Sequence, residues 1–209
     1  MNEHRRKSIR LKERDYTEPG AYFVTICTHK RAHLFGRVVD GEMELNALGE
    51  IVREEWFRTT QVRPYVELFE AEFVVMPNHI HGIIWIVAPD AVFRDLPVGA
   101  TRRVAPTTEP PRGPAPRSLG AIIGQFKSLA TKRINVLRGT PGARVWQRNY
   151  WEHIIRNERT LEAIRRYIVY NPARWAWDRY NPDAIGPDPW TRDIWRMMQI
   201  PLSPTEVQL

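Results

Sequence analysis

The chain contains little cysteine and no long apolar run, and both absences narrow the kind of protein that it encodes. Cys27 is the one cysteine among 209 residues, so an intramolecular disulfide framework is excluded and a reducing compartment is indicated. The apolar runs are too short to cross a bilayer as a helix. The first residues, MNEHRRKSIRLKERD, are polar and charged, so no signal peptide is predicted. We therefore expect a cytoplasmic protein without a membrane segment.

Acidic residues are outnumbered by basic ones, which gives a net charge of +7 and an isoelectric point near 9.8. Such a surplus attracts polyanions, of which nucleic acid is the commonest in a cytosol. A generic basic surface is the alternative explanation. The eight tryptophans would offer stacking platforms for unpaired bases wherever they are exposed. The residues that we expect to contact DNA are Arg5, Arg6, Lys7, Arg10, Lys127, Lys132, Arg133 and Arg148.

The first half of the chain predicts a strand, a helix and a hairpin. Residues 21–30 are rich in β-branched and aromatic side chains, which is typical of a strand. Asn46 is a suitable N-cap for an amphipathic helix that ends before Pro64. Two apolar runs, LFEAEFVVM and HIHGIIWIV, are separated only by Pro-Asn. This pattern predicts an antiparallel hairpin with a tight turn.

The second half begins with a Pro-rich stretch, residues 88–117, that predicts an extended connection rather than packed structure. Ser118 then caps an amphipathic helix that Gly139 ends. Residues 145–155 predict another strand, and Asn157 caps a last long helix that stops at an Asn-Pro pair. Two β-α-β halves around a central hairpin predict an α+β, ferredoxin-like sandwich, with one antiparallel sheet and helices packed on one face.

Two histidines head the apolar stretch VVMPNHIHGIIWIV, which covers residues 74–87. Side chains alternate along a strand, so His79 and His81 point the same way, about 7 Å apart at their Cα atoms. They could chelate one divalent ion, whereas the alternative is a chance pair at a strand entrance. Two ligands do not hold a metal, so a third is required. The histidines considered for that place are His4, His29, His33 and His153.

The last helix, RTLEAIRRYIVYNP, offers a second source of ligands. Tyr167 and Asn171 are four residues apart, so they lie one above the other along the margin of its buried stripe. This would present a phenol and an amide to the sheet edge. Tyr170 and Tyr150 are rival nucleophiles, and Asn171 has the simpler alternative role of ending the helix before Pro172.

Together, MPNHIHGIIW, FKS…WQRNYWEHIIRNE and IRRYIVYNP resemble the HUH single-tyrosine transposases, in particular the REP-associated tyrosine transposases, over about residues 6–178. The resemblance implies a ferredoxin-like catalytic domain that cuts and rejoins single-stranded DNA beside hairpin-forming repeats through a 5′-phosphotyrosine. It assigns Tyr167 as the nucleophile, and His79, His81 and Asn171 as ligands of Mg²⁺ or Mn²⁺. Better-known relatives often have glutamine at the last position.

The resemblance also suggests the organisation of the chain: a basic N-terminal arm (1–20), the catalytic domain (21–178, with the insertion 88–117) and a C-terminal tail (179–209). The expected partner is palindromic single-stranded DNA, bound by a monomer or homodimer in the bacterial cytoplasm and associated with the nucleoid. A different class remains open, namely a single-stranded nucleic-acid-binding module of the same fold without chemistry. Convergence of the His pair with Tyr167 and Asn171 in space would favour the enzyme over the binding module.

Overall fold

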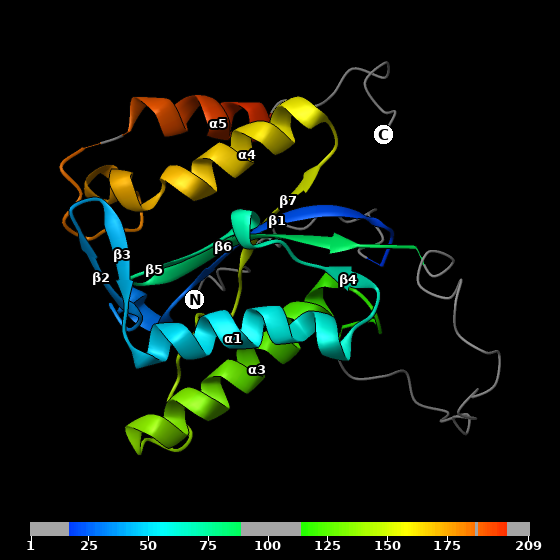
Figure 1. The fold of residues 1–209 in the computed structure, drawn as a ribbon, viewed down its shortest axis with the longest axis vertical. Coiled ribbons are helices and arrows are strands. Elements are labelled where there is room, and N and C mark those ends of the chain that lie inside the picture. Colours follow the sequence, from blue (N-terminus) through cyan, green and yellow to red (C-terminus); the bar gives the residue numbers. More distant parts are fainter. Residues whose placement is uncertain (1–16, 89–113, 187, 200–209) are drawn as a thin grey trace, which may run out of the picture.

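A five-stranded antiparallel sheet forms the centre of the molecule (Figure 1). The computed structural model describes residues 17–88, 114–186 and 188–199. The basic residues predicted in the N-terminal arm, His4 and most of the Pro-rich insertion lie outside these ranges. The strands of the central sheet are β1 (Gly20–Cys27), β4 (Val66–Glu67), β5 (Phe73–Met76), β6 (His79–Ile86) and β7 (Trp151–Ile155).

Strand β6 organises the sheet, because it pairs with three of the other strands. β1 runs along one side of β6 over its whole length, and β7 pairs with the far side of β1. On the other side of β6, β5 pairs with its first half and β4 with its last two residues. The predicted hairpin with its Pro-Asn turn is therefore confirmed as β5–β6.

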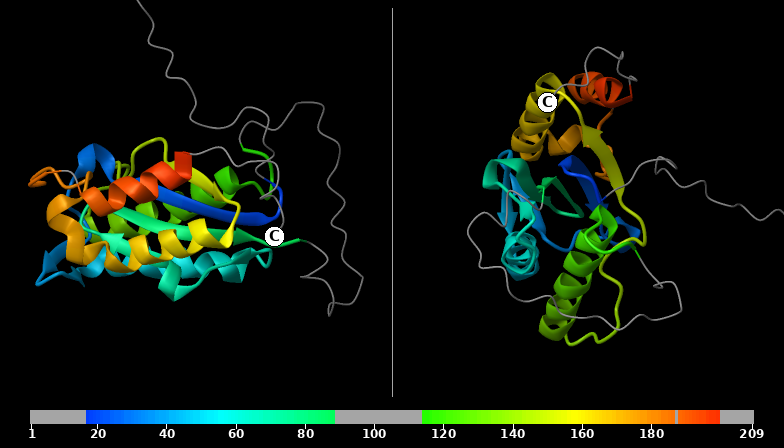
Figure 2. Two further views of the ribbon diagram at one scale, coloured as in Figure 1. Left: turned by 90° about the horizontal axis from the view of Figure 1, so that it is seen from above. Right: turned by 90° about the vertical axis from the view of Figure 1, so that its right-hand side faces the viewer.

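In the part of the chain that the structure describes, four α-helices cover the two faces of the sheet (Figures 1 and 2). The helices α1 (Ala47–Val62) and α3 (Leu119–Arg138) pack on one face of the sheet and enclose a first core. This pair confirms the prediction of an α+β fold with an antiparallel sheet and helices packed on one face. The helices α4 (Glu158–Tyr170) and α5 (Pro189–Gln199) lie over the opposite face and enclose a second core.

The helix boundaries follow the capping residues that the sequence predicts. The Asn46 side chain accepts hydrogen bonds from the backbone of the first turn of α1, and Asn157 does the same for α4. Ser118 caps α3, and Gly139 ends it in the left-handed conformation at φ +62°. The local sequence is enough to set these helix boundaries, because each capping residue satisfies amide or carbonyl groups within its own turn.

Two predicted strands are wrong in length. The stretch expected as a strand over 145–155 pairs regularly only over β7. Before β7, Trp146 forms only an isolated bridge with Thr28, and its buried ring packs against Phe35 and Phe126. The first strand ends at Cys27 and continues into the short helix η1 (His29–Arg31). Short elements that we did not predict are β2 (Gly36–Val39), β3 (Glu42–Leu45), η2 (Glu70–Glu72) and η3 (Pro172–Trp177).

The segment after α4 forms a layer over one end of the sheet. η3 continues directly from α4 and lies beside the β2–β3 hairpin. α5 then returns along α4 (Figure 2), where sequence reasoning expected only a folded tail. Among the described residues, no helix is both long enough and apolar enough to cross a membrane.

Candidate active site

The two histidines of β6 face the core beneath α4 and converge on one point. Their Nε2 atoms are 3.0 Å apart, and both side chains are fully buried. The strand explains this placement, since residues two apart share a face and Ile80 between them packs into the opposite core. The separation of the two nitrogens is that of neighbouring ligands on a single cation.

The second nitrogen of each imidazole is held by a neighbouring side chain. Nδ1 of His79 lies 2.8 Å from Oδ1 of Asn78. The Asn78 amide group donates to the backbone carbonyls of Arg31 and Tyr180, so its oxygen faces the ring and His79 Nδ1 carries the proton. Nδ1 of His81 lies 2.8 Å from the Thr25 hydroxyl. A protonated Nδ1 leaves the Nε2 lone pair free for a metal, which is the usual support for histidine ligands.

A carboxylate completes the group, and it comes from a residue that sequence reasoning did not select. Asp178 follows η3 directly, and its Oδ2 lies 4.0 Å from Nε2 of His79. The side chain is buried, and ligand atoms of His79, His81 and Asp178 all lie within 4.8 Å of one another. No motif relates Asp178 to the histidines, because nearly a hundred residues separate them. A lone aspartate after the RWAW segment was the one sequence feature that could have drawn attention to this residue.

Tyr167 is the tyrosine that the fold brings to this group. Its hydroxyl lies 3.1 Å from Nε2 of His81, and its ring meets Phe23 edge-on from above the sheet. The rival tyrosines lie elsewhere: Tyr170 is 54% exposed, and Tyr150 packs against the core under α1 and α3. Among these three, only Tyr167 contacts the histidines.

Asn171 joins the same cluster from the C-terminal cap of α4. It is buried, and its amide group donates hydrogen bonds to the Tyr167 phenol and the Asp178 carboxylate. Its Oδ1 atom is buried without a hydrogen-bond partner. A buried carbonyl oxygen without a partner is unfavourable unless a ligand or ion satisfies it. The structure thus brings together all four residues predicted for the site.

Burial dominates the electrostatics of the site. It lowers the pKa of His81 from the usual 6.5 to about 3, with a smaller contribution from Arg179, and it lowers that of His79 as well. Burial raises the pKa of Asp178 to about 6 and that of the Tyr167 phenol well above its usual 10. Each group is therefore biased toward its neutral form, as a site with a low dielectric constant requires. A cation would favour the anionic forms of Asp178 and Tyr167.

An ion pair between a half-buried arginine and a buried carboxylate fixes the register of the helix that carries the phenol. Arg165, two residues before Tyr167, lies 2.7 Å from the carboxylate of Glu72 at the entrance of β5. The other oxygen of Glu72 accepts a hydrogen bond from the indole of Trp85 on β6. These contacts join α4 to the strand that carries the histidines, so phenol and imidazoles keep a fixed relation.

The remaining histidine candidates stay away from the cluster. His153 stacks on Trp151 and lines a small pocket beside α5, and His33 contacts the ring of Trp175. His153, His33 and His29 do not belong to the group of residues whose side chains could hold a metal.

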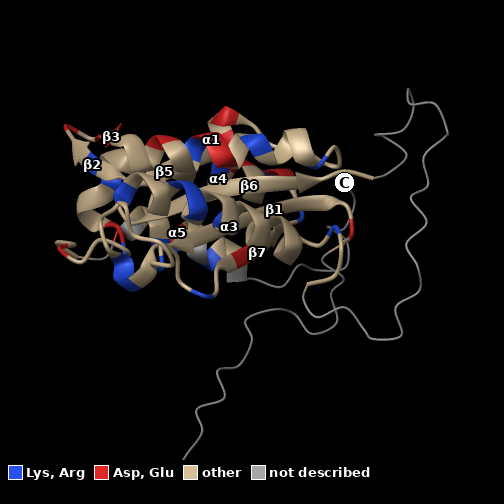
Figure 3. Cartoon of the chain, turned by 90° about the horizontal axis from the view of Figure 1, so that it is seen from below, with Lys and Arg blue, Asp and Glu red and all other residues tan. Residues whose placement is uncertain are grey.

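In the described part of the chain, Lys and Arg are interspersed with Asp and Glu (Figure 3). Of the residues predicted to bind DNA, this part contains Lys127, Lys132, Arg133 and Arg148. Lys127 donates to the backbone carbonyls of residues 147 and 148, and Arg133 pairs with Glu54 and Glu55. Lys132 and Arg148 are exposed. Their binding to DNA stays a prediction, and α3, which carries three of the residues, covers the face opposite the histidines.

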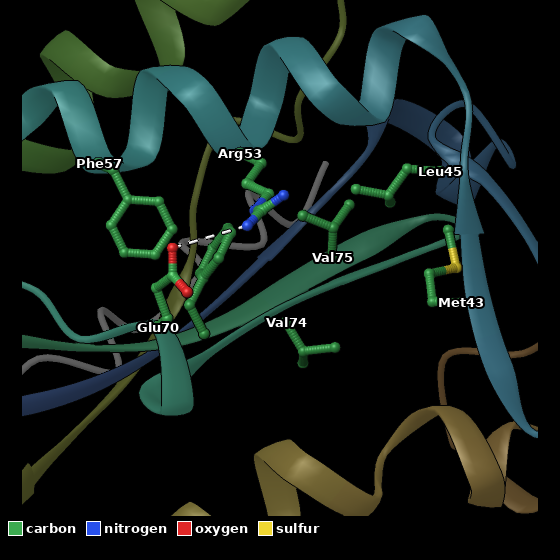
Figure 4. A pocket seen from close by; sticks show the side chains of 8 residues that line it. Met43, Leu45, Arg53, Phe57, Glu70, Val74 and Val75 are labelled. Carbon is green, nitrogen blue, oxygen red and sulfur yellow. Dashed lines mark ion pairs between the residues drawn. The ribbon is translucent and has the colours of Figure 1, made fainter.

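A hollow of about 290 Å³ between α1, β3 and β5 is separate from the cluster (Figure 4). Its lining is largely aliphatic and aromatic, with an ion pair of 3.6 Å between Arg53 and Glu70 at its side. No histidine, cysteine or tyrosine lines it. The hollow therefore offers no nucleophile, and the chemistry of the described residues centres on the buried histidines.

No protein-family model matches the chain. An uncharacterised protein of Haemophilus influenzae is 38% identical over 180 residues, which cover 86% of this chain and 95% of that protein. A second protein of H. influenzae, provisionally named a REP-associated tyrosine transposase, is 23% identical over 189 residues, covering 85% and 90%. The chain is therefore similar in sequence to a REP-associated tyrosine transposase over most of the length of both proteins. A solved structure of a REP-associated tyrosine transposase bound to a REP hairpin is 20% identical, with a TM-score of 0.48 over 92% of this chain and 89% of that one.

The similarity to a transposase gives the buried cluster a possible chemical use, because a phenol beside metal-ligating atoms is one arrangement that can break and join DNA strands. The cluster lies beneath a cover: Tyr180 packs 4.7 Å from the His79 ring, and Trp175 of η3 stacks at 6.1 Å. The cover comes from the segment that also supplies Asp178.

Proposed function

We propose that this transposase homologue is a metal-dependent enzyme that nicks and rejoins single-stranded DNA next to hairpin-forming repeats, through a 5′-phosphotyrosine on Tyr167. The observation that carries the proposal is the contact of 3.1 Å between the Tyr167 hydroxyl and Nε2 of His81. A module that only binds nucleic acid has no need to bury a phenol against an imidazole pair. The convergence of His79 and Asn171 on the same point supports the same conclusion.

The residues present suit a divalent cation. His79, His81 and Asp178 would supply two imidazole nitrogens and one carboxylate oxygen, and Asn171 offers the unpartnered Oδ1. The carboxylate matters because Mg²⁺ and Mn²⁺ favour oxygen ligands, which histidines alone do not provide. When bound, the cation would offset the negative charge that develops on the phosphate oxygens during displacement.

The chain's own groups prepare the phenol. Burial keeps Tyr167 protonated at rest, and the Asn171 amide donates a hydrogen bond that favours its deprotonated form. In the reaction, Oη of Tyr167 bonds to phosphorus while the bond from phosphorus to the 3′ oxygen breaks. The phenol loses one proton and the departing 3′ oxygen gains one. One phosphodiester bond replaces another, so the strand can be rejoined without ATP.

Access to the site requires movement of the cover. Tyr167 is 2% exposed and the two histidines are fully buried, so a phosphodiester cannot reach them in this arrangement. The covering segment is held by contacts that include the hydrogen bond of 2.8 Å from the Asn78 amide to the Tyr180 carbonyl and the Arg31 guanidinium over the Tyr180 ring. We infer that DNA binding displaces the Tyr180 ring while η3 and Asp178 keep their positions and α4 stays anchored through Arg165.

The decisive experiment incubates the full chain with single-stranded DNA from the region around its own gene and with Mg²⁺ or Mn²⁺. The expected result is a protein–DNA adduct that resists SDS and is absent from Tyr167→Phe. Tyr150→Phe is the matched control, because it removes a phenol from the opposite core and should retain the adduct. An adduct that persists in Tyr167→Phe would overturn the choice of nucleophile, and no adduct in the wild type under any of these conditions would overturn the proposed activity.

A further inference from the structure

A second pocket, of about 440 Å³, opens beside the C-terminal end of α4 on the outer side of the active-site helix. Its lining combines two aromatic rings with two guanidinium groups, a combination that suits a ligand with both a flat apolar face and a negative charge. Its volume lies within the range of small-molecule sites. The lining residues are Arg166, Tyr170, Ala173, Arg174 and Trp190.

The aromatic wall is fixed by the packing of α5 against α4. The rings of Tyr170 and Trp190 meet edge to face, with centroids 6.1 Å apart. Trp190 is partly buried and packs against the second core, whereas Tyr170 is 54% exposed and therefore accessible from solvent. An exposed tyrosine supported by a partly buried tryptophan offers a surface on which a base can stack.

The two guanidinium groups differ in how they are held. Arg174 forms a bidentate ion pair with the buried carboxylate of Asp188, and its guanidinium lies 5.0 Å from the centre of the Trp190 ring. It is therefore pre-positioned but partly neutralised. Arg166 is exposed and forms no ion pair with any described residue. Arg166 is thus the charge in the pocket that is available to an incoming anion.

The position of the pocket connects it to the reacting group. Arg166 precedes Tyr167 directly, and Tyr170 follows Tyr167 by three residues, which places both on neighbouring faces of the same helix turn. The pocket therefore lies within one helix turn of the residue to which a strand would be joined.

We propose that this pocket is a subsite for one unpaired nucleotide of the DNA strand, with the base stacked on Tyr170 and a phosphate held by Arg166. The inference rests on the proposed function, because the strand is the substrate of Tyr167. It assigns Tyr170 a binding role and explains why a second tyrosine lies so close to the nucleophile without contacting the histidines. The subsite fixes the register of the strand and so selects the phosphodiester that reaches the phenol.

Binding is tested with a fluorescein-labelled deoxythymidine homopolymer, followed by anisotropy over a series of salt concentrations. Tyr170→Ala should weaken binding about tenfold to a hundredfold, the loss expected for one stacked base, and Tyr170→Phe should restore it. Arg166→Gln should weaken binding and lower the salt slope by about 0.7, as the loss of one contact to a single-stranded phosphate requires. Tyr170→Ala should leave that slope unchanged.

The matched control for charge is Arg159→Gln, which removes another exposed arginine two turns earlier on α4. It should bind as the wild type does. Thermal midpoints of all variants establish that α4 and α5 remain folded. If Tyr170→Ala and Arg166→Gln bind the homopolymer as tightly as the wild type, the subsite is wrong.

Crosslinking supplies an independent readout. A homopolymer with one 5-iododeoxyuridine is irradiated with the wild-type protein, and the crosslinked peptides are identified by mass spectrometry. Crosslinks to Tyr170 or Trp190 support the subsite, and crosslinks confined to other regions overturn it. Competition by inorganic phosphate alone, with no crosslink to either ring, would show a simple anion site and would also overturn it.

The two proposals fail separately. A Tyr167-dependent adduct that forms equally well in Tyr170→Ala and Arg166→Gln, with unchanged cleavage position, leaves the enzyme proposal intact and removes the subsite. Crosslinks at Tyr170 together with weaker binding by both variants, but no adduct in the wild type, keep the subsite and remove the nicking activity.

Discussion

The Tyr167 hydroxyl and Nε2 of His81 are 3.1 Å apart, although 86 residues separate them in the chain. The same Nε2 atom faces Nε2 of His79 at 3.0 Å. With its Nδ1 proton directed to Thr25, His81 has one lone pair to offer, so the phenol and a cation compete for it. The resting contact therefore keeps the Tyr167 phenol protonated and beside the imidazole pair.

This competition predicts that Tyr167→Phe binds Mn²⁺ more tightly than the wild type. Removing the phenol releases the lone pair of His81 from a hydrogen bond worth about 0.5–1.5 kcal/mol, which corresponds to a gain of about two- to tenfold in affinity. Isothermal titration calorimetry of the two proteins checks the prediction. Weaker Mn²⁺ binding by Tyr167→Phe would instead make the phenol itself a ligand.

Asp178 is predicted to hold the cation together with the histidines. Asp178→Asn keeps the size of the side chain and the oxygen that accepts a hydrogen bond from the Tyr180 amide at 2.6 Å, but removes the charge. Mn²⁺ affinity should fall by about tenfold or more, since changes just outside a metal's ligand shell already cost that much. The control is Asp183→Asn, which removes an exposed carboxylate five residues after Asp178. Equal Mn²⁺ affinity in Asp178→Asn and the wild type would exclude the carboxylate as a ligand.

Acid should destabilise the protein partly through His153. Burial, with a smaller contribution from Arg156, lowers the pKa of His153 from 6.5 to about 4. Between these values the unfolded chain binds a proton that the folded chain does not, so stability rises with pH across this window and is lost as the pH falls. His153→Gln should show a shallower loss of the thermal midpoint from pH 6.5 to 4. A slope identical to that of the wild type would contradict the pKa of His153.

Gly82 on β6 is predicted to be intolerant of a side chain. A Cβ at this position would lie 2.5 Å from the ring of Trp56, which stacks on Phe73 at 4.6 Å and is itself fully packed. Gly82→Ala should therefore lower the free energy of unfolding by about 1–3 kcal/mol, as overpacking of a core does. Chemical denaturation measures the change.

The control for Gly82 is Gly124→Ala, because a Cβ on Gly124 meets no atom within 4 Å. Gly124 lies inside α3, where alanine is the better helix former, so this change should raise the free energy of unfolding by about 0.5–1 kcal/mol. Opposite signs for the two glycines would confirm that close packing under α1, rather than backbone freedom, dictates Gly82.

The helix ends and the histidine pair could be predicted because their causes are local. Asn46, Ser118 and Asn157 bind amides within their own first turns, and Gly139 adopts a conformation that other residues avoid. Alternation along a strand likewise places His79 and His81 on one face without reference to any other segment. The spacing of four residues likewise places Tyr167 and Asn171 on one side of their helix, because such residues are neighbours on a helix surface.

The length of β7, the helix α5 and the role of Asp178 depend on contacts between distant segments. The Trp146 ring packs into the core under α1 and α3 while its backbone forms only an isolated bridge with Thr28, and Trp190 contributes to a pocket only because α5 packs on α4.

The sequence by itself determined the caps, the strand alternation and the residue types that this chemistry requires. Only the tertiary structure decided that the Asp178 carboxylate meets the imidazoles. Burial and proximity arise from the whole packed chain, and no spacing pattern in the sequence indicates them.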